Sequence, residues 1–588
     1  MKPFEFYQNR IVFAEGEIQS ARKKVQLFTF LRLFVFITLG LSLYFSWGSA
    51  PLFFTVFFIG MAIFLKMVSI SVDAKLKLEK AKELKKINES EIEVLNGNWS
   101  MFDHGADFQN GQHAFSNDLD VFAQKGIFGF LNRTITARGK RALANLMLNG
   151  TNNSVYNNAI IEALSKEISW TQTFRVSGSI TSREGATQLS VEQLLKTKVE
   201  NPSWVNWFRF VVPVITIPAL ILYQMDLISG LAFTAVLLAA VLPTMSLLRT
   251  TNLIAADLGK FEPKIGMMLD QIQSLEQLSS TDPQLLELIS SLRGTNSAES
   301  EIRQWLKINK RFEIRMNILV GIPLNIFFGW DLWQRKSLEK WMDKNEILLL
   351  SWEQVLSELE VYISGANLRY NYPQTVYASF SDQNELEVIN MTHPLLSSIK
   401  SVSNDLRMDD QNQFMILTGP NMAGKSTYLR AVGLIFVMAN AGFPVFADSV
   451  KLPRMKLYSS MRTSDDLSNE SSYFHAELTR LKFIMNAIEQ EQKIFILLDE
   501  ILKGTNSKDK EEGSKKFLEK LQRMGAKGII ATHDLSLCEL SNEHPAFSNG
   551  YFDSTIEGEN LFFDYTWRKG VCQNMNASFL LKKMNLVD

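Results

Sequence analysis

Four apolar runs interrupt an otherwise charged chain, and they fall into two pairs. The first pair is residues 27–47 and 51–72, and the second pair is residues 207–223 and 227–248. Each run approaches the ~20 residues with which a helix crosses the hydrocarbon core of a bilayer. The short turns between partners predict two transmembrane helical hairpins. The alternatives are buried hairpins in a soluble core or, for the first run, a cleaved signal peptide.

Basic residues flank the hairpins and are missing from the turns that connect their partners. Lys24 precedes the first pair and Lys75 follows it, while Arg209 and Arg249 lie at the two ends of the second pair. Positive charge marks the cytoplasmic side of membrane segments. The pattern therefore predicts a multi-pass membrane protein with the remaining domains in the cytoplasm.

The segments between the hairpins have a polar helical period. Residues 73–95 predict a long exposed helix that leaves the membrane, and residues 253–292 and 298–363 predict long, largely polar helices. The net charge of -1 provides no global electrostatic argument for nucleic acid. The two cysteines, Cys538 and Cys572, have no metal-ligand spacing, which indicates reduced thiols.

A glycine-rich loop follows a buried strand at residues 415–417 and precedes an apolar helix at residues 428–439. Its pattern is G-x-x-x-x-G-K-[ST], in which backbone amides and the helix N-terminus cradle phosphates, lysine reaches the outer phosphates and the hydroxyl binds Mg²⁺. The loop therefore predicts ATP and Mg²⁺ as ligands. The predicted nucleotide-binding residues are Gly419, Pro420, Asn421, Met422, Ala423, Gly424, Lys425, Ser426 and Thr427.

Two further buried strands end in residues that suit phosphoryl chemistry. One strand ends in Asp499 and Glu500, and the other is followed by His533. In such a sheet the strand ends line the nucleotide crevice, where the first acid holds Mg²⁺ and the second activates water. We therefore predict Ser426 and Asp499 as metal ligands, and Lys425, Glu500 and His533 as catalytic residues.

Six ordered motifs resemble those of the MutS family. They are MTHPLL at residues 391–396, GPNMAGKSTYLR at 419–430, SYFHAEL at 472–478, LDEILKGT at 498–505, ATH at 531–533 and GVC at 570–572. Residues 118–122 and 131–139 resemble the start of that family's core, or lever, domain. The resemblance implies an ABC-type ATPase that dimerises so that both subunits close each nucleotide, with Ser472 facing the partner's γ-phosphate.

Departures from the family pattern accompany these matches. Ala423 replaces a glycine, Tyr473 replaces a threonine, and Leu502 replaces another glycine just after the acids. Alanine for glycine costs up to ~1 kcal/mol if the backbone there needs positive φ. The catalytic positions all match, so the resemblance implies that ATP hydrolysis is retained.

The predicted fold is an α/β P-loop (ABC-type) ATPase domain at the C-terminus, preceded by an all-α core or lever domain that two transmembrane hairpins interrupt. We divide the chain into a cytoplasmic segment (1–26), hairpin 1 (27–72), the first part of the helical core (73–206), hairpin 2 (207–248), its second part (249–370) and the ATPase domain (371–588).

Two functional hypotheses remain, and both predict a homodimer through the ATPase domain. The first is a membrane-anchored MutS-like ATPase that binds mismatched, branched or damaged DNA. The second is a membrane-embedded mechanochemical ATPase that acts on a membrane or protein partner without DNA. Only about a hundred residues precede Asp118, so we expect no mismatch-reading domain, and the triplet at residues 13–15 resembles that domain's Phe-x-Glu in letters only.

Overall fold

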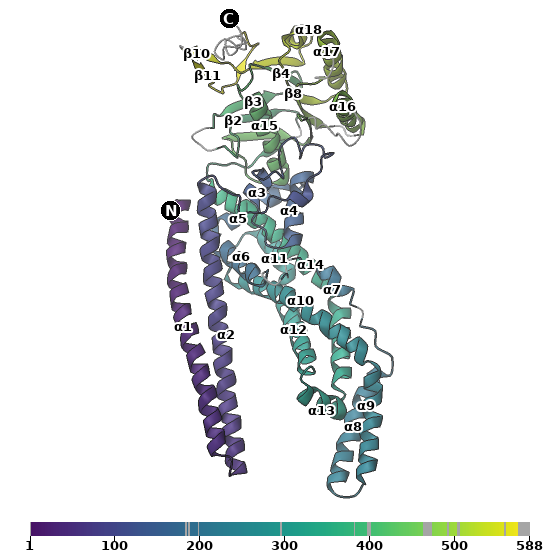
Figure 1. Ribbon diagram of the computed structural model, residues 1–588. Coiled ribbons are helices and arrows are strands. Elements are labelled where there is room, and N and C mark those ends of the chain that lie inside the picture. Colours follow the sequence, from purple (N-terminus) through teal and green to yellow (C-terminus); the bar gives the residue numbers. More distant parts are fainter. Residues whose placement is uncertain are drawn as a thin grey trace. The chain divides into compact units, whose positions relative to one another are not determined.

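The computed structural model divides the chain into two compact units (Figure 1). Unit 1 comprises Met1–Ile92, Thr134–Lys140 and Glu167–Val361, and unit 2 comprises Glu93–Arg133, Arg141–Lys166 and Tyr362–Asp588. The structure describes residues 2–182, 185, 188–197, 199–293, 297–381, 383–396, 401–462, 473–490, 493–502, 506–557 and 560–573.

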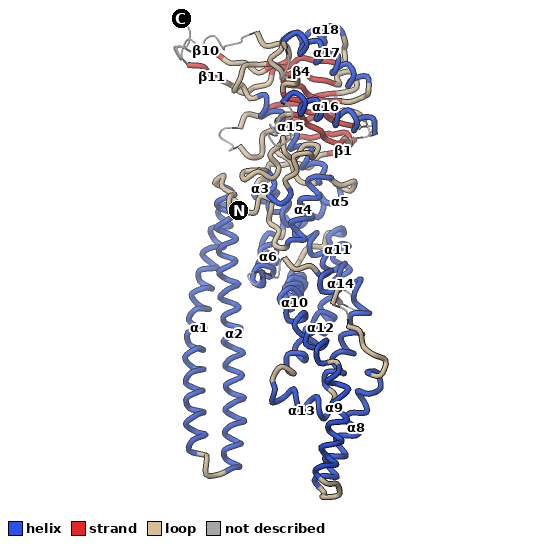
Figure 2. Tube along the Cα trace, turned by 45° about the vertical axis from the view of Figure 1, so that its right-hand side comes forward, coloured by secondary structure: helices blue, strands red, loops and turns tan. Residues whose placement is uncertain are grey.

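Unit 1 is helical throughout its described residues (Figure 2). Its helices are α1 (Pro3–Phe45), α2 (Ala50–Leu95), α6 (Ile168–Ser182), α7 (Val191–Leu195), α8 (Val205–Gln224), α9 (Gly230–Ser246), α10 (Leu248–Ser274), α11 (Pro283–Ile289), α12 (Ala298–Ile314), α13 (Ile318–Phe328) and most of α14 (Trp330–Asn371), with 3-10 turns η2 (Leu275–Gln277) and η3 (Ser290–Leu292).

Helices α1 and α2 lie side by side and are joined by a short turn (Figures 1 and 2). Tyr7, Ala14 and Ala21 are buried at a seven-residue spacing on α1, and α2 buries Ala74 and Ala81 at the same spacing. A seven-residue repeat keeps one seam of each helix facing its partner, and small side chains let the two backbones approach. The hairpin therefore extends well beyond its apolar runs.

The predicted helix at residues 73–95 forms as the second half of α2, but the prediction that it is exposed is wrong along one face. Asn88 and Glu91 are fully buried there. Asn88 exchanges hydrogen bonds with Gln172 of α6, and Arg175 of α6 pairs with Glu91 at 2.7 Å. A charged helical face indicates solvent only when no partner supplies the opposite charge.

The apolar runs form helices of unequal length. By length and composition α1, α2 and α8 could each cross a membrane, while α9 has 17 residues and joins the following helix at a bend of 55°. Pro243 lacks a backbone donor in the last turn of α9, and Leu247 donates to Thr244 at a three-residue spacing, which ends the α-helix. Among the described residues the candidate spans number three, or four if the bent pair is one span.

The expectation of a largely polar helix across residues 298–363 is wrong in its middle. The structure has three helices there, and the central one, α13, has the apolar sequence ILVGIPLNIFF. It packs against α8 and α9. When hydropathy is averaged over a long window, the polar residues of α12 and α14 outweigh an apolar helix as short as α13.

Unit 2 combines helices with three sheets. Its helices are α3 (Ile127–Leu131), most of α4 (Ala137–Asn149), α5 (Ser154–Lys166), α15 (Lys425–Ala441), α16 (Tyr473–Gln490), α17 (Ser507–Arg523) and α18 (Leu540–Glu543), with 3-10 turns η1 (Ala106–Phe108) and η4 (Leu535–Glu539). A four-stranded sheet has the order β1 (Ser379–Ser381), β5 (Ser449–Pro453), β2 (Leu386–Met391), β3 (Asn404–Met408), and β10 (Thr555–Glu557) pairs with β11 (Asn560–Phe562).

The six-stranded sheet positions the candidate site. Its order is β12 (Arg568–Lys569), β9 (Phe547–Tyr551), β4 (Phe414–Thr418), β8 (Lys527–Ala531), β7 (Ile494–Asp499), β6 (Lys456–Ser460), and every pair but β12 with β9 is parallel. Strands β4 and β8 are buried along their whole length, as expected of central parallel strands covered on both faces. Parallel pairing brings the carboxyl ends of β4, β7 and β8 to one edge.

Candidate functional site

A cavity of about 940 Å³ opens at this edge of the sheet. One set of lining residues comes from the glycine loop, the first turn of α15 and the ends of β7 and β8. The other set is largely aromatic and apolar and includes Met391, Val402, Phe552 and Tyr565. A cavity of this volume, with a polar and charged side facing an apolar one, is large enough for a small molecule.

The glycine loop takes positive φ at Gly419 (143°), Met422 (66°) and Gly424 (107°). A Cβ on Gly419 would lie 2.5 Å from the carbonyl oxygen of Phe552, so a side chain does not fit at that position. Ala423 is fully buried and is not among the positive-φ residues. The replacement of a glycine by Ala423 therefore adds no left-handed strain.

Lys425 begins α15 and points back over the loop. Its Nζ donates to the carbonyl oxygens of Gly419 at 2.7 Å and Pro420 at 3.0 Å. Burial lowers the pKa of Lys425, and the nearby carboxylates of Asp499 and Glu500 oppose that effect. The ammonium group is thus held among acceptors on the cavity wall.

Ser426 and Asp499 meet although 73 residues separate them. The Oγ of Ser426 donates to Oδ2 of Asp499 at 2.6 Å. Mg²⁺ binds hard oxygen ligands, usually one or two from the protein together with substrate phosphates. A hydroxyl and a carboxylate placed side by side beside a phosphate-binding loop therefore fit Mg²⁺.

Glu500 and His533 also meet in the cavity. The Nε2 of His533 lies 3.0 Å from Oε1 of Glu500 and 3.4 Å from Nζ of Lys425. Five predicted residues, Lys425, Ser426, Asp499, Glu500 and His533, therefore lie around one cavity.

The backbone just after β7 is strained. Glu500 has φ 51° and Leu502 has φ 58°, and left-handed backbone costs a residue with a side chain about 1–2 kcal/mol. The backbone N–H of Leu502 donates to Oε1 of Glu477 on α16, which is itself buried. The MutS family has glycine at the position of Leu502. Glycine would adopt this backbone conformation without strain, whereas Leu502 does not.

The sequence did not predict His393, Asn404 or Tyr565 as lining residues. Burial, with a smaller contribution from Arg430, lowers the pKa of His393 to about 4, so its imidazole is neutral at pH 7. The side-chain amide of Asn404 donates to the carbonyl oxygen of Tyr565 at 3.0 Å, which fixes Tyr565 beside Gly424. The motif at residues 391–396 includes His393, but its pattern does not indicate a contact with the cavity.

The predicted trans contact of Ser472 lies outside the described residues, as do residues 503–505. Helix α16 begins in the described chain at Tyr473. The role of Ser472 stays a prediction from the family resemblance.

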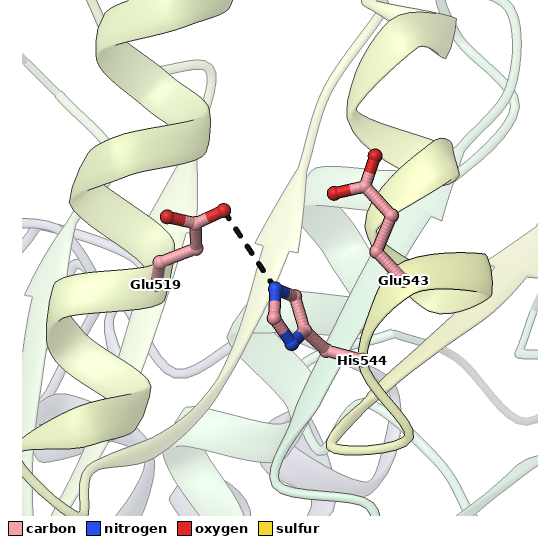
Figure 3. A group of neighbouring side chains, drawn as sticks. All are labelled: Glu519, Glu543 and His544. Carbon is pink, nitrogen blue, oxygen red and sulfur yellow. Dashed lines mark ion pairs between the residues drawn. The ribbon is translucent and has the colours of Figure 1, made fainter.

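A second polar group consists of Glu519 on α17, Glu543 at the end of α18 and His544 just after it, and the three side chains lie close together (Figure 3). Their ligand atoms lie within 4.8 Å of one another. Ion pairs already engage them, because Lys515 contacts Glu543 at 2.7 Å and Nε2 of His544 lies 3.8 Å from Glu519. These exposed contacts are accounted for as links between the two helices.

The C-terminal part of the chain matches a known family model, and the chain is similar to several known proteins. Residues 415–584 match the model MutS domain V. The DNA mismatch repair protein MutS of Thermotoga sp. (strain RQ2) is 32% identical over 241 residues, which are 40% of this chain and 30% of that protein. MutS of Fusobacterium nucleatum is 37% identical over 194 residues, 32% of this chain and 21% of that protein.

A further relative gives the same coverage. The DNA mismatch repair protein MutS of Lysinibacillus sphaericus (strain C3-41) is 31% identical over 243 residues, 40% of this chain and 28% of that protein. The chain thus spans less than a third of the length of the relatives it matches. The family model matches the domain that contains the cavity.

Proposed function

We propose, from the premise that this chain is a member of the MutS family through its C-terminal domain, that it binds MgATP in the cavity of unit 2 and hydrolyses ATP. The observation that carries the proposal is the convergence of Lys425, Ser426, Asp499, Glu500 and His533 on one cavity beside the glycine loop. These residue types in this arrangement match the parts of a P-loop ATPase.

Each residue has a role that follows from its position. The amides of the loop and the start of α15 hold phosphate oxygens, and Lys425 turns from the loop carbonyls toward the outer phosphates. Ser426 and Asp499 hold Mg²⁺, which neutralises charge on the phosphates when bound. Glu500 accepts a proton from the attacking water, and His533 holds the carboxylate of Glu500 in place.

The rest of the cavity suits the nucleoside. Neutral His393 and the ring of Tyr565 belong to the largely apolar part of the lining, where a flat heterocycle stacks without placing a charge against it. We expect the base to lie there.

We further propose that two chains close on ATP through this domain, as the family resemblance implies, and that closure moves the helices of unit 1. Hairpins α1/α2 and α8/α9 anchor that unit in a membrane, and unit 2 lies in the cytoplasm. The proposal is supported by exposed apolar surface on these helices and by basic residues at their ends.

Two variants test the ATPase proposal. Lys425→Ala is expected to weaken ATP binding about 10- to 100-fold, because a hydrogen bond to a charged group is worth about 1.5–3 kcal/mol. Glu500→Gln is expected to keep ATP binding and slow hydrolysis by about 10²–10⁴-fold. Binding of a fluorescent ATP analogue and steady-state phosphate release measure the two effects.

Exposed residues of the same unit provide matched controls. Lys451→Ala and Glu512→Gln make the same two kinds of substitution at positions outside the cavity. Neither is expected to alter ATP binding or hydrolysis. Normal hydrolysis by Glu500→Gln would exclude Glu500 as the base, and normal ATP binding by Lys425→Ala would exclude the proposed phosphate site.

The names of the relatives, DNA mismatch repair proteins, favour a second candidate, in which the ATPase acts on mismatched, branched or damaged DNA. DNA binding of this kind falls steeply with salt because phosphate contacts release counterions. A salt-dependent DNA affinity that ATP alters supports this candidate. Stimulation of hydrolysis by lipid vesicles, with no effect of DNA, supports action on a membrane or protein partner instead.

A further inference from the structure

Helix α13 has more exposed apolar surface than its length suggests. Leu319 is 85% exposed and Ile318 is 72% exposed, and Val320, Ile322 and Phe328 are exposed as well. Large contiguous apolar patches on a protein surface mark contacts with a partner or with lipid. Neither predicted hairpin includes this helix.

Helix α13 is docked on the second hairpin. The Oγ1 of Thr216 on α8 donates to the carbonyl oxygen of Phe327 at 2.8 Å. Gly329 ends α13 in the left-handed region, and a Cβ there would meet Val212 of α8 at 3.3 Å. The apolar surface of α13 therefore continues that of α8 and α9.

An ion pair joins the two ends of the α13 segment. Arg315 precedes the helix and Asp331 follows it, and the two side chains form a buried ion pair at 2.9 Å. The chain before α13 and the chain after it are therefore held close together by this ion pair. Eleven residues of helix span only about 16 Å, against a hydrocarbon core of about 30 Å, so α13 does not cross a bilayer.

The polar groups of the segment are satisfied on the side of the protein. The Nδ2 of Asn325 donates to Gly321 O and to Oδ1 of Asp331, both at 3.2 Å, and Oδ1 of Asn325 accepts from the N–H of Asp331 at 2.9 Å. Asn317 caps the first turn by accepting from Leu319 N at 3.1 Å. Lipid tolerates a segment only when its polar groups are paired internally, and these are.

Tryptophan and arginine side chains lie next to the same segment. The guanidinium group of Arg209 lies 4.7 Å from the ring centre of Trp333, whose Nε1 donates to the carbonyl oxygen of Arg209 at 3.1 Å. The Nε1 of Trp330 donates to Arg311 O at 3.0 Å. Such side chains concentrate where hydrocarbon meets headgroups, and arginine favours the cytoplasmic leaflet.

We propose that α13 is a third membrane element, which lies in the headgroup and upper acyl region of the cytoplasmic leaflet and whose partner is bilayer lipid. The inference rests on the proposed membrane anchoring of hairpin α8/α9. It adds a shallow helix that holds the base of that hairpin at the membrane surface.

Spin labels on three exposed apolar positions test the proposal. The full chain is reconstituted in phosphatidylcholine and phosphatidylglycerol vesicles with Leu319→Cys on α13, Leu238→Cys in the middle of α9, or Val155→Cys on α5 as the aqueous reference. Collisions with oxygen report lipid, and collisions with a water-soluble nickel chelate report water. The native thiols Cys538 and Cys572 are buried, and the labelled unmodified chain measures their background.

The label at position 319 is expected to favour oxygen several-fold over the label at 155, and less strongly than the label at 238. A label at 319 that matches 155 while 238 remains in lipid overturns the role of α13 and assigns its face to a protein partner. Labels at 319 and 238 that both match 155 overturn the membrane anchoring itself. Hydrolysis of ATP, measured on the same samples, verifies folding and tests the ATPase proposal separately.

Discussion

Helices α15 and α9 have the same length and each contains a long apolar stretch, but their surroundings are opposite. Of the 17 residues of α15, 13 are buried, whereas α9 buries only Ala240 and Thr244 of its 17. Helix α15 follows the glycine loop and packs against β6, β7 and β8, while the outer face of α9 has no described protein element over it. Hydrophobicity indicates that a surface avoids water, and the fold decides whether protein or lipid covers it.

Charged residues show the same contrast between the units. In unit 2 they gather around an open cavity, where Lys425, Asp499 and Glu500 can meet a ligand. In unit 1 charged side chains are buried as pairs, including Arg175 with Glu91 and Lys264 with Glu353. The charged residues around the cavity can contact a ligand, whereas the buried pairs of unit 1 hold its helices together.

The largest effect on the comparison is expected from Arg175→Met. Removing one partner of a buried pair leaves Glu91 without this cation and costs about 3–5 kcal/mol. Thermal unfolding in detergent is expected to show the loss in unit 1, while ATP affinity is unchanged. The double variant Arg175→Met with Glu91→Leu is expected to recover most of the stability. Full stability of the single variant would contradict a structural role for the pair.

Leu238→Arg tests which solvent covers α9. A charge at the centre of a membrane helix costs about 2.5–3.5 kcal/mol, so we expect less protein to insert, as measured by carbonate extraction of membranes. The control Val155→Arg places the same charge on an exposed apolar position of unit 2 and is expected to change stability by less than about 0.5 kcal/mol. Equal effects at the two positions would remove the distinction between the units.

Acid is expected to affect the two units in opposite directions. The pKa of His393 is lowered to about 4 in the fold, so between about pH 6.5 and 4 the unfolded chain binds more protons. The contribution of His393, up to about 3 kcal/mol, is present above pH 6.5 and is lost as pH falls toward 4.

Burial raises the pKa of Glu360 in unit 1, although it accepts hydrogen bonds from Ile135 N and Thr136 N. Its contribution is present below its unfolded pKa near 4.5 and is lost as pH rises through the folded value. The free energy of unfolding is measured against pH. We expect His393→Gln to remove the loss of stability between about pH 6.5 and 4, and Glu360→Gln to remove the loss of stability as pH rises through the folded pKa of Glu360. Unchanged slopes in either variant would assign the pH dependence to other groups.

The smallest effect is expected from Ala423→Gly, which restores the family's residue in the glycine loop. Because Ala423 is not at positive φ, glycine relieves no strain there and adds freedom to the unfolded chain, which costs about 0.5–1 kcal/mol. Chemical unfolding of unit 2 measures the change. A gain in stability would show that the loop does need glycine at this position.

The clustering of the predicted site residues around one cavity could be predicted because most of these residues lie at or next to strand ends. Asp499 ends one apolar strand and His533 follows another, and parallel strands bring their ends together whatever loops intervene. His393 and Tyr565 reach the cavity through contacts that no local pattern indicates. Helix α13 escaped prediction because a mostly apolar helix of eleven residues between polar helices is too short to stand out in the sequence.

The sequence by itself determined the glycine loop, the acids at the strand end and the apolar runs, because each depends on residues that are close along the chain. Tertiary structure decided that Glu91 is buried, that Ala423 avoids positive φ and that Arg315 meets Asp331 across α13. Those outcomes depend on which distant segments supply a partner charge or a covering surface. The energies of these contacts depend on the three-dimensional arrangement of the helices and strands, which the local sequence does not determine.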